Sequence, residues 1–190
     1  MKIARVTLSD RATAGIYADV SGPEIERIAG QFFDEPLEWV RVLMSDDRNE
    51  LEDALRRLID EENCPLILTT GGTGPAPRDI TPEATRAVIE KELPGFGEVM
   101  RMQSYAKVRT AILSRATAGS RGRSLIVNLP GRPRAIEECA MCTCAPVSSA
   151  ISKISRSAID SANGGRVRQC MIGSVRPAAR ASSVSFSTSS

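Results

Sequence analysis

Residues 65–84 read PLILTTGGTGPAPRDITPEA, and this stretch carries the main information about the fold. It begins with the short apolar run 65–70, which is typical of a parallel strand covered on both faces. Glycines break the run, and a helix is then predicted with Thr81 as its N-cap and Pro82 at its first position. A strand that ends in a loop and continues into a helix is the basic unit of a parallel α/β sheet.

The same alternation of strand and helix extends to both sides of this stretch. Strands are predicted at 2–8, 37–44, 65–70 and 123–130, and helices at 22–33, 46–62, 81–92, 95–107 and from about Pro133. The helix at 46–62 shows the expected period, because Leu51, Leu55 and Leu58 fall on one face. Strands separated by helices in this order predict an α/β fold, a three-layer αβα sandwich with a mostly parallel sheet.

Length and composition limit the class of protein. The chain has 190 residues, of which 42% are hydrophobic and 25% charged, as in a soluble globular domain. Its net charge of +2 is too small to indicate nucleic acid as the main partner. The opening MKIARVTLSD lacks the apolar region of a signal peptide, and no run approaches a membrane span. We therefore expect a cytoplasmic protein with reduced cysteines and no membrane partner.

Histidine is absent from the sequence. Its absence excludes Ser-His-Asp and Cys-His catalysis and most zinc sites. Cys139, Cys142 and Cys144 form a CxxCxC cluster, but no fourth ligand follows at a suitable spacing. We therefore expect no metal at these cysteines.

Composition changes near Cys139. Residues 140–190 contain 13 serines, six basic residues and a single acidic residue, Asp160. We expect residues 1–139 to form the catalytic domain, and 140–190 to form a divergent Ser/Arg-rich segment that is partly disordered. One hypothesis is that this segment is a diverged or out-of-frame ending.

The loops that follow the predicted strands carry polar side chains. They read SDRATAG, SDD, GGTGPAPRD and NLPGRP in chain order. In a parallel sheet such loops emerge at one edge, and ligands bind there. The charged side chains expected to meet at this edge are Asp10, Arg11, Asp46 or Asp47, Arg78 and Asp79.

This set of residues indicates the binding of a phosphate and a hard metal ion. Gly71, Gly72 and Gly74 expose backbone N–H groups to an anion, and Thr70 and Thr73 add hydroxyl donors. One or two carboxylates together with substrate phosphates are what Mg²⁺ usually needs. The loop lacks the ending of a P-loop and the third glycine of the dinucleotide fingerprint. The sequence therefore predicts phosphoryl or nucleotidyl transfer from a loop of another kind.

Five longer segments follow one another in the chain, namely VTLSDRATAGIYADVSG, TTGGTGPAPRDITPEAT, PGFGEVMR, TAILSRATAGSRG and LIVNLPGRPRAIEEC. In this order they resemble the MogA family of molybdopterin adenylyltransferases, whose fold is shared by MoaB proteins and gephyrin-type G domains. The resemblance covers nearly all of residues 2–139. It implies a nucleotidyltransferase that uses Mg²⁺ to transfer AMP from ATP to molybdopterin, with release of pyrophosphate. An alternative is a non-catalytic molybdopterin-binding or scaffolding module.

The resemblance also implies roles for particular residues. Asp46 and Asp79 match the two essential aspartates of the family and are expected to be catalytic and to hold Mg²⁺, although Asp47 remains an alternative to Asp46. The residues expected to bind substrate are Ser9, Asp10, Arg11, Thr70, Gly71, Gly72, Thr73, Gly74, Arg78, Ser114, Arg115, Asn128, Pro130 and Gly131. A homotrimer and a molybdenum-insertion partner are expected on the same basis.

Overall fold

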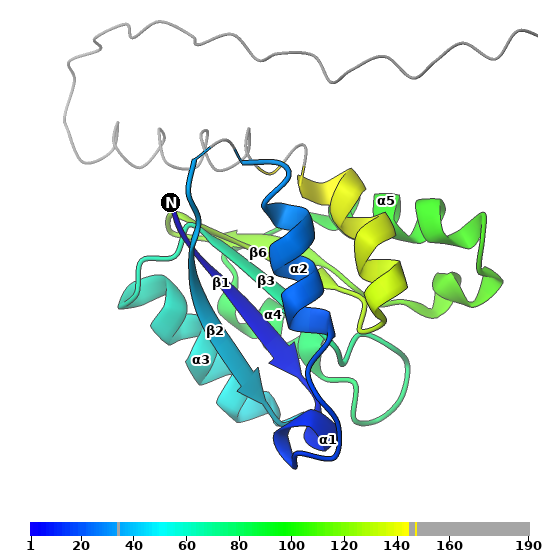
Figure 1. Ribbon diagram of the computed structural model, residues 1–190, viewed down its shortest axis with the longest axis horizontal. Helices are drawn as coiled ribbons and strands as arrows, with labels where there is room; N and C mark the ends of the chain where they lie inside the picture. The colour runs from blue at the N-terminus through cyan, green and yellow to red at the C-terminus, as the bar shows by residue number, and fades with distance from the viewer. Residues whose placement is uncertain (34, 145–146, 148–190) are drawn as a thin grey trace, which may run out of the picture.

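A six-stranded sheet forms the centre of the computed structural model, which describes residues 1–33, 35–144 and 147 (Figure 1). The strands are β1 (Lys2–Leu8), β2 (Glu38–Met44), β3 (Leu66–Thr70), β4 (Lys91–Glu92), β5 (Ala118–Arg121) and β6 (Ser124–Leu129). Their order across the sheet is β2-β1-β3-β6-β5-β4. The first four in this order are parallel, whereas β5 pairs antiparallel with both β6 and β4. The prediction of a mostly parallel sheet is confirmed.

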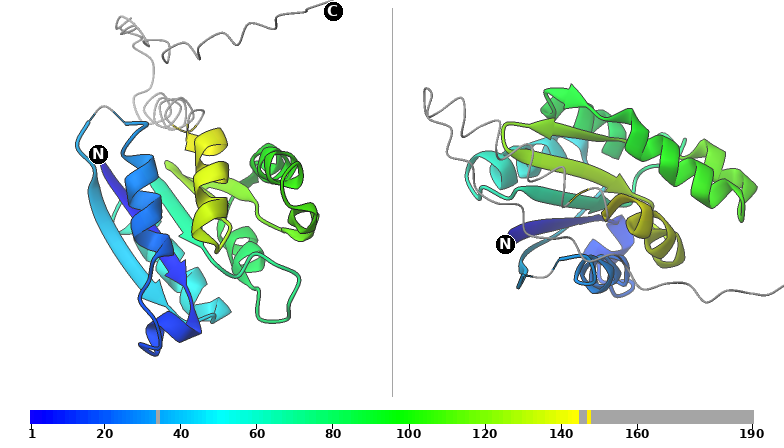
Figure 2. Two further views of the ribbon diagram at one scale, coloured as in Figure 1. Left: turned by 45° about the vertical axis from the view of Figure 1, so that its right-hand side comes forward. Right: turned by 90° about the horizontal axis from the view of Figure 1, so that it is seen from above.

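Helices cover both faces of this sheet (Figures 1 and 2). They are α1 (Asp10–Thr13), α2 (Ser21–Ala29), α3 (Arg48–Asp60), α4 (Thr81–Val88), α5 (Pro94–Tyr105), the 3₁₀ helix η1 (Arg109–Leu113) and a helix that runs from Pro133 through Cys144. The helices α3 and α4 lie on one face, while α2 and the helix from Pro133 lie on the other. The predicted three-layer αβα arrangement is therefore confirmed.

The side chains of β1 alternate between the two faces of the sheet, so this strand contributes residues to two separate hydrophobic cores. Ile3 points toward α2 and packs in the same buried cluster as Ile25 and Ile28. Ala4 and Val6 belong to the opposite cluster, which α3 and α4 complete. Because successive side chains of a strand alternate between faces, a nearly continuous apolar run is what a strand buried on both sides requires.

The antiparallel edge of the sheet was not predicted. The helix expected at 81–92 ends at Val88, and the chain then enters the two-residue strand β4. The sequences of β4 (KE) and β5 (AGSR) are short and polar, so they carry no apolar run from which a strand can be predicted. Both strands form because β6 offers a free edge on this side, to which β5 pairs.

The helix from Pro133 passes through Cys139 without a break. Ala140, Cys144 and Val147 are buried in the same core cluster as Ile136. The division of the chain at residue 139 stays a prediction, because most of residues 140–190 lie outside the described part of the chain. Within the described residues, no helix is long and apolar enough to cross a membrane.

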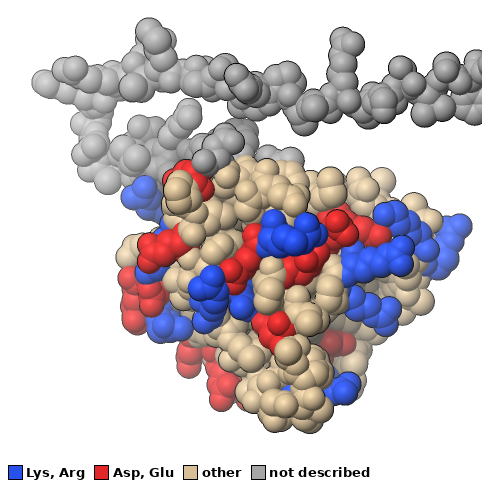
Figure 3. Space-filling model, in the orientation of Figure 1, with Lys and Arg blue, Asp and Glu red and all other residues tan. Residues whose placement is uncertain are grey.

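Glu26 ties α2 to the two strands beneath it. Its carboxylate accepts hydrogen bonds from Arg5 of β1 at 2.6 Å and from Arg41 of β2 at 2.8 Å. Acidic and basic side chains alternate over this face of the molecule (Figure 3). The hydrogen bonds from Arg41 lower the pKa of Glu26, and those from Arg5 add to this effect against the opposing effect of burial.

We predict that Glu26→Gln destabilises the fold at neutral pH by about 1–2 kcal/mol, because charge-assisted hydrogen bonds are lost. Since the pKa is lowered in the folded state, this stabilisation is present above the ordinary value of 4.5 and is lost as the pH falls through the folded-state value. Thermal melts should show that Glu26→Gln has a melting temperature roughly 2–8 °C below that of the wild type at pH 7, and that this difference disappears as the pH falls to 3. Glu24→Gln, which removes an ion pair with Arg27 within the same helix, is the control and should change the melt little. A difference in melting temperature between wild type and Glu26→Gln that persists at pH 3 would show that the stabilisation by Glu26 is not electrostatic.

Candidate functional site

Four loops meet at the carboxyl edge of the parallel strands. The loop after β1 bonds to the end of β2, since the Ser9 N–H donates to the Met44 carbonyl at 2.9 Å. The loop after β3 bonds to the loop after β6, since the Thr70 hydroxyl donates to the Pro130 carbonyl at 2.8 Å. The structure therefore brings together segments that lie up to 120 positions apart in the chain. The strand order reverses between β1 and β3, which is where ligands bind in sheets of this kind.

The glycine loop crosses this switch point in a conformation that side chains rarely adopt. Gly71 has a φ of 98° and Gly72 a φ of 59°. A Cβ atom on Gly71 would lie 2.3 Å from the Leu8 carbonyl oxygen. Gly131 approaches from the β6 side, where its own Cβ would lie 3.3 Å from the Gly71 Cα. Glycine is therefore needed here for close packing between loops as well as for the turn itself.

Three carboxylates gather beside this loop. The Asp46 N–H donates to Asp10 Oδ1 at 3.0 Å, and Asp46 Oδ1 lies 3.5 Å from the position that a Cβ on Gly72 would take. Burial raises the pKa of Asp46, and the negative charges of Asp10 and Asp79 raise it further. The site therefore concentrates negative charge, which a cation would relieve.

Asp46 and Asp47 have different surroundings, although they are neighbours in sequence. Asp47 is the N-cap of α3, and its carboxylate accepts from the Glu50 N–H at 3.0 Å. Asp46 is half-buried and faces Asp10 and Gly72. Of the two, only Asp46 is free to act at the glycine loop.

Arg78 and Arg11 both lie at the rim of the site. The exposed Arg78 forms an ion pair with Asp10 and partly offsets the negative charge around Asp46. Arg11 lies over the ring of Tyr17, with its guanidinium carbon 5.0 Å from the ring centre. The Tyr17 hydroxyl is 2.8 Å from Ser9 Oγ, so Arg11, Tyr17 and Ser9 form one connected group on the loop after β1.

Asn128 is fully buried, and its amide donates to Thr69 at 3.0 Å and to Thr85 at 2.9 Å. Its side chain lies between the sheet and α4, on the face opposite the Thr70 hydroxyl. That Asn128 contacts a substrate stays a prediction, although both of its amide N–H groups are bonded within the protein. Its physical role is to bind α4 to the strand that carries the glycine loop.

Thr81 does not cap α4, so the expectation that it is the N-cap is wrong. The N-cap residue is Ile80, which makes no side-chain capping bond, and Thr81 is the first residue of the helix. The Thr81 hydroxyl donates instead to the Gly71 carbonyl at 2.8 Å, while the Thr81 N–H donates to the Gly72 carbonyl at 3.1 Å. The first turn of α4 thus holds the glycine loop in place.

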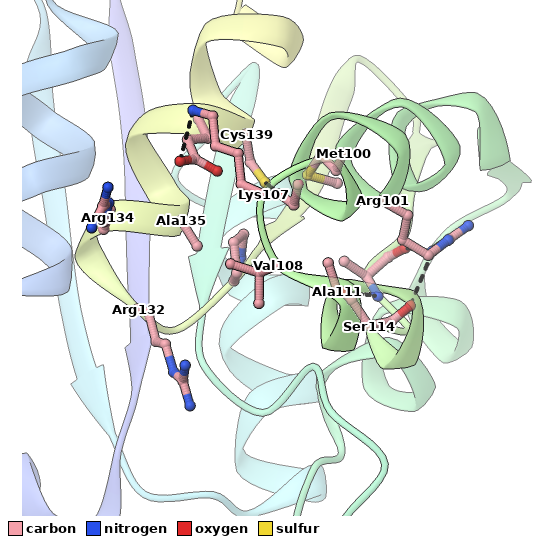
Figure 4. Close-up of a pocket in the computed structure, with 14 residues that line it drawn as sticks. Met100, Arg101, Lys107, Val108, Ala111, Ser114, Arg132, Arg134, Ala135 and Cys139 are labelled. Atoms are coloured by element: carbon pink, nitrogen blue, oxygen red, sulfur yellow. Dashed lines mark hydrogen bonds and ion pairs between the residues drawn. The ribbon is translucent and has the colours of Figure 1, made fainter.

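Two cavities open at this edge of the sheet. The smaller, of about 200 Å³, lies between the loops after β1, β3 and β6, and Ser9, Tyr17, Thr70, Gly71 and Gly131 are among its lining residues. The larger, of about 430 Å³, lies between α5 and the helix from Pro133 (Figure 4). Its lining residues include Ser114, Pro130 and four basic side chains, namely Arg101, Lys107, Arg132 and Arg134.

The sequence interpretation missed the basic lining of the larger cavity. Arg132 lies within the loop NLPGRP, where it was given no role, and Arg134 is the residue directly after that loop. Lys107 could not be predicted as a cavity residue from the sequence, because only the packing of α5 brings it to the helix from Pro133. There its ammonium group donates to Glu138 at 2.9 Å (Figure 4). Tyr17, which follows the loop SDRATAG, is a further site residue that the sequence interpretation did not identify.

The cysteine cluster lies on the helix from Pro133, and Cys139 is among the residues that line the larger cavity. Cys139 and Cys144 are buried, and burial raises the pKa of Cys144 to about 11. Within the described residues, no group of three acidic or cysteine side chains is arranged to hold a metal ion by itself.

A glycine loop and a carboxylate cluster at the switch point of a parallel sheet define an α/β domain of the kind that binds phosphorylated ligands. Residues 4–149 match the family described as "Probable molybdopterin binding domain", and the chain belongs to this family.

Individual relatives agree with this assignment. The chain is 53% identical over 137 residues to a molybdopterin adenylyltransferase of Helicobacter pylori, which covers 72% of this chain and 78% of the relative. It is 47% identical over 138 residues to that of Escherichia coli K12, with coverages of 73% and 71%. Among solved structures, the molybdopterin biosynthesis enzyme MoaB of Thermus thermophilus superposes with a TM-score of 0.74 at 37% identity, covering 82% of this chain and 96% of that one.

Proposed function

We propose that this protein is a molybdopterin adenylyltransferase of molybdenum cofactor biosynthesis. It transfers AMP from ATP to the terminal phosphate of molybdopterin and releases pyrophosphate. The observation that carries the proposal is the grouping of Asp46, Asp10 and Asp79 at the glycine loop, in a chain about half identical to proteins named for this activity. A nucleotidyl transfer needs such an arrangement, because two phosphate groups that repel each other must be held together.

The residues of the loop act by positioning and by charge. Backbone N–H groups of Gly72 and Gly74 face the phosphates, while Arg78 balances negative charge at the rim. A phosphate oxygen of molybdopterin attacks the α-phosphorus of ATP. The new P–O bond forms as the bond to pyrophosphate breaks, and pyrophosphate leaves with the electron pair. Fixed dipoles and charges of this kind stabilise the transition state without reorganisation.

Asp46 and Asp79 are the residues that would hold Mg²⁺. Their carboxylate oxygens are hard donors. Burial raises the pKa of Asp46, and the charges of Asp10 and Asp79 raise it further, so a cation would stabilise its ionised form. The donor set fits Mg²⁺, since this ion uses one or two carboxylates and completes its shell with water and substrate phosphates. When bound, Mg²⁺ would supply the positive charge that neutralises the triphosphate.

The homotrimer, the cytoplasmic location and the molybdenum-insertion partner are proposals on the basis of the family resemblance. Large apolar side chains along α5 and η1 support an assembly, because a monomer rarely exposes many of them together. Met102, Ile112 and Leu113 are the most exposed of these.

Pyrophosphate release tests the proposed function directly. We expect the wild-type protein to release pyrophosphate from ATP only when molybdopterin and Mg²⁺ are both present, with one adenylylated pterin formed per pyrophosphate. Mass spectrometry of the pterin product checks this ratio. If the folded protein binds molybdopterin tightly but releases no pyrophosphate, the non-catalytic binding module is the correct function.

A further inference from the structure

Arg115 spans the base of the loop that carries Asp79. Its N–H donates to the Thr73 carbonyl at 2.9 Å, and its Nε donates to the Gly74 carbonyl at 2.7 Å. Its Nη2 donates to the carbonyl of Asp79 itself. One residue from the segment before β5 therefore holds both ends of the segment 74–79, whose middle residues are exposed.

The Asp79 carboxylate is oriented by the same short segment. Asp79 Oδ2 accepts from the Ala76 N–H at 2.8 Å, while the Asp79 N–H donates to the Ala76 carbonyl at 2.9 Å. Asp79 Oδ2 also lies 2.7 Å from where a Cβ on Gly74 would be. The two carbonyls that Arg115 holds, those of Gly74 and Asp79, thus flank the carboxylate directly.

Most of the N–H donors of the Arg115 guanidinium are used within the protein. Three of the five guanidinium N–H donors serve Gly74, Asp79 and Glu83. Lysine could not replace it, because a single ammonium group cannot reach two carbonyls and a carboxylate in a planar arrangement. This geometry differs from that of Arg78, which is exposed and pairs only with Asp10 among the described residues.

Glu83 completes the arrangement from the first turn of α4. Its Oε1 accepts from Arg115, while its Oε2 is buried without a hydrogen-bond partner among the described residues. Burial acts to raise the pKa of Glu83, but the hydrogen bond and charge of Arg115 outweigh it, and the pKa is lowered. Glu83 is therefore a charged group whose partner is Arg115, and the pair links α4 to the loop.

We propose that Arg115, held by Glu83, is a positioning residue that fixes the glycine loop and aims the Asp79 carboxylate into the site. It does not bind substrate itself. This inference rests on the proposed function for its effect on turnover, but the fixing of the loop is a property of the protein alone.

Arg115→Lys tests the inference, because it keeps the positive charge and removes the planar fork. We expect kcat to fall by about 100-fold, the loss that follows when a reacting group is misplaced by about 1 Å. KM for molybdopterin should stay within about threefold of the wild type. The control is Arg86→Lys in α4, where an exposed arginine pairs with Glu92 away from the loop, and its kcat should not change. A rise in KM with kcat unchanged would show that Arg115 binds substrate and would overturn the inference.

A double-mutant cycle asks whether Arg115 acts through Asp79. In the Asp79→Ala background, Arg115→Lys should cause less than a twofold further loss of activity, because the group that it positions is already gone. If the activity losses of the two single variants multiply in the double variant, Arg115 and Asp79 act independently and the inference is overturned.

Hydrogen exchange provides a readout that needs no turnover. Amide exchange measured by mass spectrometry over residues 71–81 should be at least tenfold faster in Arg115→Lys than in wild type, and unchanged in Arg86→Lys. Glu83→Gln should also exchange faster over these residues, by a smaller factor. It replaces Arg115→Lys as the test variant if Arg115→Lys does not fold. Unchanged exchange in a folded variant would overturn the inference. Absence of pyrophosphate release by the wild type would instead overturn the proposed function and leave the exchange result standing.

Discussion

Asp46→Ala is expected to abolish pyrophosphate release, while Asp47→Ala is expected to retain it and to lose stability instead. We expect the first variant to lose at least about 10²–10³ in kcat, the range seen when one electrostatic contact to the transition state is removed. The second should keep kcat within about twofold and lose about 1 kcal/mol of stability, because the N-cap of α3 is lost. Steady-state pyrophosphate assays and thermal melts of both variants check the pair.

The stability of Asp46→Ala is as informative as its activity. Burial and the charges of Asp10 and Asp79 disfavour the ionised form of Asp46 in the folded protein. Removing it should therefore leave the melting temperature at pH 7 unchanged or raise it. An inactive variant that is also strongly destabilised would mean that Asp46 is structural, and full activity in Asp46→Ala with loss in Asp47→Ala would reverse the assignment.

The meeting of the four loops could be predicted from the sequence, because parallel strands place their carboxyl ends at one edge. The distinction between Asp46 and Asp47 could not. Both follow the same strand, and an SDD segment at a helix start gives a capping residue and a site residue the same local pattern. Only the cap geometry, with Asp47 accepting from Glu50, separates them.

Two side chains at the site make contacts that could not be predicted from the sequence. Thr81 is expected from its position to cap α4, which is wrong, and Asn128 is expected from the family resemblance to bind substrate, which stays a prediction. In the structure each side chain is fully buried and bonds to a neighbouring element, Thr81 to the Gly71 carbonyl and Asn128 to Thr69 and Thr85. Tertiary contacts of this kind leave no local pattern in the sequence. The same is true of Arg115, whose contacts with the glycine loop are made across about 40 residues of chain.

Gly71→Ala should produce the largest loss of stability among single changes at the loop. Two costs combine at this position. A methyl group at a φ of 98° is strained, and it would lie 2.3 Å from the backbone oxygen of Leu8, which cannot move without shifting β1. We expect about 3 kcal/mol of destabilisation or more, or roughly 6–12 °C in melting temperature for a chain of this size.

Gly122→Ala separates the two costs. Gly122 also has a positive φ, of 53°, but no atom lies within 4 Å of the position of its Cβ in the described structure. This variant should lose only about 1 kcal/mol, the cost of the left-handed conformation, and should keep its activity because it lies in the turn between β5 and β6. Gly71→Ala should lose activity even at temperatures where it is folded, since the loop must move away from Leu8 and carry Gly72 away from Asp46. If Gly71→Ala and Gly122→Ala have the same melting temperature, the close approach of the glycine loop to β1 is not a rigid feature of the site. The loop can then move away from β1 without loss of stability.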